Sequence, residues 1–289
     1  MPVTALWRAR PCLKHNSGMT STQQQVAQSV DDTAEGYIVF EQPLNERMRT
    51  FMRLDFLYNQ ALYQSEIATA ASARAAMSGL LDILSITTRS DMRSDALKEL
   101  ERHLTHLNEF QSRPGVDAAR LKTIIANLGR LRADLMEAGS AFLQPIRDSE
   151  FLNSIKLRSA IPGGTCEFDL PEYFCWLSQP AEVRMRAFGQ WLGLLRPLCD
   201  AIAELLWLTR QAGRSRDEIA KGGVFMIGFD RDAPAQLLRI ALPAQDGLFP
   251  EISGGGQHRC NVRFLKWNGF TTRAAPIDED VPFTLTICA

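Results

Sequence analysis

Three features are scarce in this 289-residue sequence: long apolar runs, an excess of charge of either sign, and an N-terminal segment of signal-peptide type. No run approaches the ~20 apolar residues that a membrane-spanning helix needs. The 32 basic side chains nearly balance the 33 acidic ones, so no overall field attracts nucleic acid or an anionic membrane. We therefore expect a cytoplasmic protein without membrane insertion, in which any anionic partner is recognised by a local basic patch.

Cysteine and histidine are also few, and their spacing is unlike that of a metal site. The sequence has six cysteines and four histidines, no CxxC pair, and no histidine cluster close to a cysteine. Zinc sites and disulfide scaffolds need such clusters, so this spacing predicts reduced, mostly buried thiols and no bound metal. The cysteines are Cys12, Cys166, Cys175, Cys199, Cys260 and Cys288.

Catalytic motifs are absent as well. The sequence contains no GxSxG or HExxH motif, and no GxGxxG follows a strand-like run. The glycine-rich SGGGQH at 253–258 is not followed by GK[ST], so we expect a hairpin loop rather than a phosphate-binding loop. His103 and His106 have the spacing of two helical metal ligands but lack a third. We predict a protein that is not an enzyme and that needs no cofactor.

What is present is organised around residues 37–58, where a strand-like run leads into a helix. The segment 37–43 alternates β-branched and aromatic residues and is predicted to be a strand that ends at Pro43. Asn45 is a predicted N-cap of the following helix. The polar segment 1–36 has no sustained periodicity and is predicted to be a disordered leader, in which Met19 is an alternative start.

Helical periodicity dominates the next part of the chain, and we predict a helical domain over 44–213. Leucines three and four positions apart mark helices up to a break at Pro114-Gly115, and Asp117 is a predicted cap of the helix that follows. TCEFDL, near 164–170, is predicted to be a short β insertion. The predicted helices cover 69–86, 97–107, 117–135, 151–160 and 181–212, with a further short helix from Pro171.

From 222 to 289 the period falls to two, which predicts a small β domain. Its expected antiparallel strands are VFMIGF, LLRIAL, HRCNVRFLKW and PFTLTIC, separated by turn-forming residues. The strand at 37–43 would join this sheet, because an exposed sheet edge needs cover. The predicted fold class is α+β: mainly an α-helical bundle domain, plus a smaller antiparallel β-sheet domain that includes the N-terminal strand.

Arginines are the side chains with the clearest pattern. Arg47, Arg49 and Arg53 follow one another on the first helix, and Arg259 and Arg263 share one face of a predicted strand. Guanidinium groups gathered between two domains suit a carboxylate-bearing peptide. The same residues are equally compatible with solubilising charges paired to nearby acids.

Several motifs resemble one family. FEQPLNERMRTFMRLDFL, SRPGVDAARL, SAIPGGTCEFDLP and FPEISGGGQHRCNVRF are similar to segments of ZapD, the FtsZ-associated cell division family of Gram-negative bacteria, and the similarity extends over about 36–289. The resemblance implies a homodimer that acts in septation at the mid-cell division site. It also implies direct FtsZ binding, filament bundling that promotes Z-ring assembly, and a lower FtsZ GTPase turnover.

The resemblance further implies that a basic surface binds the C-terminal tail of FtsZ. Phe174 stands where relatives often have histidine, and Glu150 where some have a basic residue, so the tail would be held somewhat differently here. A nucleic-acid-binding protein that uses the same basic face is the alternative, although the balanced charge does not favour it. The matching positions are Arg49, Arg53, Arg89, Arg93, Arg259 and Arg263.

Overall fold

The computed structural model describes residues 36–89, 91–111, 116–230, 235–254 and 259–289. The predicted leader, apart from Gly36, and the Pro114-Gly115 break lie outside these residues. Four of the six residues of the SGGGQH loop do so too.

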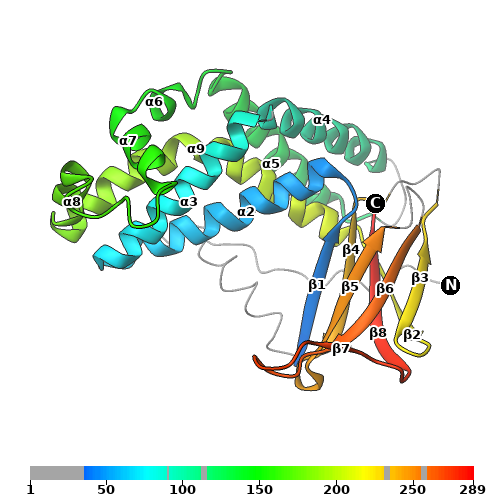
Figure 1. Ribbon diagram of the computed structural model, residues 1–289. Helices are drawn as coiled ribbons and strands as arrows, with labels where there is room; N and C mark the ends of the chain where they lie inside the picture. Colours follow the sequence, from blue (N-terminus) through cyan, green and yellow to red (C-terminus); the bar gives the residue numbers. More distant parts are fainter. Residues whose placement is uncertain (1–35, 90, 112–115, 231–234, 255–258) are drawn as a thin grey trace.

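Helices form one region of the molecule, on one side of the strands (Figure 1). The long helix α9 runs through this region and packs against α2, α4 and α5, while α2 and α3 form an antiparallel pair. Gly79 allows the close approach of this pair, because a Cβ atom there would lie 3.1 Å from Cβ of Ala61. The helices are α2 (Glu46–Ser65), α3 (Ala70–Arg89), α4 (Met92–Phe110), α5 (Ala118–Glu137), α6 (Gln144–Arg147), α7 (Glu150–Ser159), α8 (Pro171–Leu177) and α9 (Ala181–Gln211).

Local capping explains where two of these helices begin, as the sequence predicted. Asn45 Oδ1 accepts a hydrogen bond of 2.8 Å from the backbone N–H of Met48 at the start of α2. Asp117 Oδ1 accepts bonds of 3.1 Å from two N–H groups at the start of α5. The spacing of apolar residues then buries one stripe of each helix in a common core, which includes Phe51, Leu80 and Leu195.

The strands form two antiparallel sheets. One has the order β1-β4-β8-β2, and the other has the order β3-β6-β5, with β7 paired to β6. A shared apolar core, which includes Ile240, Phe264 and Leu285, lies between the two sheets. The strands are β1 (Tyr37–Pro43), β2 (Arg214–Ala220), β3 (Val224–Gly228), β4 (Leu237–Pro243), β5 (Leu248–Gly254), β6 (Arg259–Lys266), β7 (Ala275–Pro276) and β8 (Val281–Cys288).

The α+β class is therefore confirmed, and so is the place of the N-terminal strand. β1 pairs with β4 from Tyr37↔Pro243 to Pro43↔Leu237, although nearly 200 residues separate the two strands in the sequence. α2 follows β1 directly, so the first strand belongs to the β-sandwich and its helix to the helical region (Figure 1).

Two details of the prediction need correction. The segment 164–170 is not a strand but a series of turns, in which Gly164 N–H bonds to Ile161 O and Leu170 N–H bonds to Cys166 O. These peptide groups are satisfied locally, so no strand ladder forms. In addition, strands begin at Arg214 rather than after 222, because β2 pairs with β8 along its whole length.

Candidate partner-binding surface

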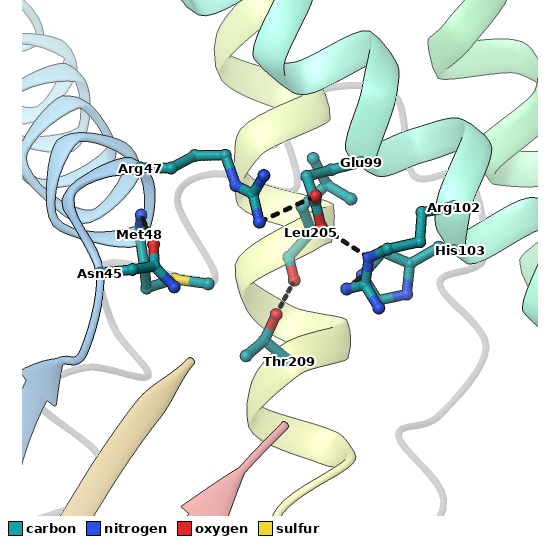
Figure 2. Close-up of polar contacts among 8 residues, drawn as sticks. All are labelled: Asn45, Arg47, Met48, Glu99, Arg102, His103, Leu205 and Thr209. Atoms are coloured by element: carbon teal, nitrogen blue, oxygen red, sulfur yellow. Dashed lines mark hydrogen bonds and ion pairs between the residues drawn. The ribbon is translucent and has the colours of Figure 1, made fainter. Parts of the chain in front are cut away.

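The start of α2 lies where the helices meet the sandwich, and its first arginine is already bound. Arg47 Nη2 lies 2.9 Å from Glu99 Oε1 of α4, and Arg102 Nε lies 3.0 Å from Glu99 Oε2 (Figure 2). Only 8% of the Glu99 side chain is exposed, so one nearly buried carboxylate is shared by two guanidinium groups. Arg47 therefore joins α2 to α4. Of the three arginines on α2, this leaves Arg49 and Arg53 for contact with a partner.

Arg49 and Arg53 lie one turn apart on the same helix. Arg49 forms an exposed ion pair of 3.4 Å with Glu46, a type of contact that contributes little to stability. Arg53 is exposed, and no described residue forms a hydrogen bond or ion pair with it. Both side chains are thus accessible to a partner.

Arg89 and Arg93 line one groove of about 390 Å³ between the ends of α3, α4 and α6. Arg93 donates hydrogen bonds to the carbonyl groups of Leu135 (3.0 Å) and Met136 (3.3 Å), at the C-terminal end of α5. Arg147, which the sequence analysis missed, lines the same groove and donates to Thr87 O at 2.9 Å. Arg93 and Arg147 thus satisfy the carbonyl groups of two helix ends, whereas Arg89 is exposed and has no described partner.

Arg259 and Arg263 lie on β6, on the face of the sheet that points away from the sandwich core. Cys260, Val262 and Phe264 alternate with them and are buried. Both arginines are exposed, and no ion pair to either is found among the described residues. They share this outer face with Val224 and Met226 of β3, whose side chains are 41% and 76% exposed.

The six predicted arginines therefore lie in three separate places, with different surroundings: on α2, at the facing ends of α3 and α4, and on β6. Arg89 and Arg93 line a common groove. Arg93 has a structural role that the sequence could not reveal, because its acceptors lie 42 and 43 residues away. Arg53, Arg89, Arg259 and Arg263 are the exposed members without a described partner.

A buried charge network fixes the sandwich to the helices. Arg210, in the last turn of α9, donates hydrogen bonds of 2.9 and 2.8 Å to the two carboxylate oxygens of Glu41 on β1. Arg239 of β4 lies 2.9 Å from the same carboxylate. Burial raises the pKa of Glu41, but Arg210 and Arg239 together outweigh burial, so its net pKa is lowered. This network holds α9 in a fixed position against the sheet.

Of the two histidines with metal-ligand spacing, His103 contacts an arginine. Arg102 Nη2 lies 3.2 Å from His103 Nε2. Arginine can only donate, so Nε2 is the acceptor. Burial, and then the charge of Arg102, lower the pKa of His103 to about 4. Within the described residues, no three His, Cys, Asp or Glu side chains are grouped as a metal site.

Nor does any helix in that part of the chain have the length and apolar character needed to cross a membrane.

Comparisons with known proteins agree with one another. The profile of the ZapD family, described as a cell division protein, matches residues 52–263. The chain is 38% identical over 252 residues to the cell division protein ZapD of Methylococcus capsulatus, which covers 87% of this chain and 98% of that relative. It is 35% identical to the protein of the same name from Dechloromonas aromatica and 36% identical to that of Janthinobacterium, each over 87% of this chain and 99% of the relative. This chain therefore belongs to the ZapD family of cell division proteins.

Proposed function

We propose that this protein binds FtsZ directly, through the C-terminal tail of FtsZ, and crosslinks FtsZ protofilaments into bundles. The observation that carries the proposal is the set of exposed arginines without a described partner, within a family of cell division proteins. Guanidinium groups that form no ion pair within their own chain can form bidentate hydrogen bonds with carboxylates of another. In this proposal the protein acts at the cytoplasmic mid-cell division site without catalysing a reaction.

Bundling also requires more than one binding site per particle, and a homodimer supplies two. Four large apolar side chains are exposed within residues 157–174, at the end of the helical region formed by α7 and α8. Such a concentration favours a protein contact, and we propose that a second copy covers it. The side chains are Leu157 (74% exposed), Ile161 (50%), Phe168 (83%) and Phe174 (45%).

Valence then explains how weak contacts suffice. A filament presents one tail per subunit, so a dimer that holds one tail is close to many others. The high effective concentration allows single-site contacts of modest affinity to hold two filaments together. Filaments held side by side exchange subunits more slowly, which in this proposal promotes Z-ring assembly and lowers GTPase turnover.

The proposal is tested by co-sedimentation with GTP-assembled FtsZ, comparing full-length FtsZ with FtsZ that lacks its C-terminal tail. We expect the protein to pellet only with full-length filaments and to thicken them into bundles. Absence from both pellets contradicts the proposed partner. Equal amounts in both pellets contradict the tail as the binding site.

Two controls sharpen this test. Binding should weaken as salt rises, because exposed charge pairs are screened over about 10 Å at 0.1 M salt. Phe168→Asp should yield a monomer in analytical ultracentrifugation that binds the tail but does not bundle filaments. A single-stranded oligonucleotide that binds as tightly as the FtsZ tail would instead favour nucleic-acid binding.

A further inference from the structure

β3 is an edge strand with few of the features that usually protect such edges. Its sequence, VFMIG, contains no charged residue and no proline, and among the described strands it pairs only with β6. The turn that joins it to β2 is closed by the isolated bridge Lys221↔Val224. Figure 1 shows β3 at the outer border of the sandwich. One side of this strand is therefore open within the described part of the chain.

The hydrogen-bond pattern identifies which backbone groups face the open side. Phe264 N–H donates to Gly223 O, and in an antiparallel pair every second residue bonds to the neighbouring strand. The N–H and C=O groups of Phe225 and Ile227 therefore face β6. Those of Val224, Met226 and Gly228 face the other way. Val224 N–H confirms this direction, since it donates to Lys221 O across the turn. Met226 and Gly228 thus present main-chain groups along an open edge.

Side chains on the outer face add an apolar and a basic component to this edge. Met226 is 76% exposed, and Arg259 of β6 lies directly opposite Gly228 of β3. Gly228 has no side chain, and no atom of a described residue lies within 4 Å of the place where its Cβ would be. The Arg259 guanidinium can therefore reach over β3 toward a strand added beyond it. Arg263 lies opposite Val224 of β3 and, on its other side, opposite Glu251 of β5, so only Arg259 faces a position without a side chain.

We propose that β3 binds an extended acidic peptide as an additional strand of the sheet. Backbone groups of the peptide pair with Met226 and Gly228. An apolar side chain of the peptide packs beside Met226, and a carboxylate two positions along reaches Arg259 over Gly228. This inference rests on the proposed function, because it assigns the FtsZ tail as the acidic peptide and strand addition as its mode of binding.

The first test compares Met226→Pro with Met226→Ala in the full-length protein, using a fluorescent peptide of the FtsZ C-terminal tail. Proline removes the N–H on the open side and leaves the bonds to β6 intact, whereas alanine keeps that N–H. We expect the proline variant to bind roughly tenfold more weakly than the alanine variant. Equal affinity of the two variants overturns strand addition.

The second variant, Gly228→Val, separates binding from folding. Valine is favourable in strands, and its Cβ would meet no atom of a described residue. The fold should therefore be retained, as circular dichroism and thermal unfolding would show. Its side chain lies between Arg259 and the added strand, so we expect roughly three- to tenfold weaker binding and a smaller salt dependence. Ile219→Ala, on exposed strand β2 of the other sheet, is the matched control and should bind normally.

Hydrogen exchange in the unmodified protein tests strand addition even if the proline variant does not fold. Saturating peptide should slow exchange of the Met226 and Gly228 amides, whereas the Phe225 and Ile227 amides are already bonded to β6. Peptide binding without this protection overturns strand addition and leaves the proposed function standing. No peptide binding at all, together with no co-sedimentation, overturns the proposed function and this inference with it.

Discussion

Arginines at the junction of the two regions and arginines on the outer face of the sandwich have opposite surroundings. At the junction, Arg210 and Arg239 share the carboxylate of Glu41, whose side chain is only 17% exposed. On the outer face, Arg259 and Arg263 are exposed and have no described ion-pair partner. Arginine therefore holds the fold together at the junction, whereas on the outer face it forms no described ion pair. The difference depends on burial and on carboxylates from distant parts of the chain.

The largest expected effect comes from breaking the junction network. Glu41→Ala leaves two guanidinium groups without their shared carboxylate, and removing one partner of a buried pair costs about 3–5 kcal/mol. Urea unfolding of the full chain would measure this loss. The matched control is Glu218→Ala on β2, whose partner Arg216 is 56% exposed, and its cost should stay below about 1 kcal/mol. Similar losses of unfolding free energy in Glu41→Ala and Glu218→Ala would contradict a special role for the buried network.

The second effect is a pH dependence that arises on α4, beside the junction. Folding lowers the pKa of His103 to about 4, mainly through burial and then through the charge of Arg102. The contribution of neutral His103 to the free energy of unfolding is therefore complete above the unfolded pKa of about 6.5. It is lost as pH falls from there toward 4. Between pH 7 and pH 5 the unmodified protein should lose roughly 1–2 kcal/mol more than His103→Gln. Urea unfolding of both proteins at pH 7 and pH 5 measures this difference. Equal losses of unfolding free energy in the two proteins would contradict the prediction.

A smaller effect is expected at Arg93, which the sequence analysis placed in the binding surface. Arg93→Ala removes two hydrogen bonds to the end of α5 and should cost about 1 kcal/mol. Arg89→Ala, in the same groove, removes no described contact and should leave the urea midpoint unchanged. If Arg93→Ala is as stable as Arg89→Ala, the capping role is wrong and Arg93 is as free as its neighbour.

The sequence revealed the local structure well, because helix periods and caps are local signals. The Asn45 and Asp117 caps were predicted correctly, and so was the strand before Pro43. β2 was missed because RSRDEIA lacks apolar alternation: it is an exposed edge strand, defined by its pairing with β8. Arginine roles were likewise hidden, since the partners of Arg93 and Arg210 are more than 40 residues away.

The smallest effect on stability is expected on the outer face, where the comparison can be tested most directly. Arg259→Ala removes no described hydrogen bond or ion pair, so its unfolding free energy should change by less than about 0.5 kcal/mol. Its affinity for the FtsZ tail peptide should nevertheless fall, since charge-assisted hydrogen bonds are the stronger kind. Urea unfolding and fluorescence anisotropy on one preparation give both numbers. A loss of stability as large as that of Arg93→Ala would mean that Arg259 also holds the fold, and the distinction between the two groups of arginines would fail.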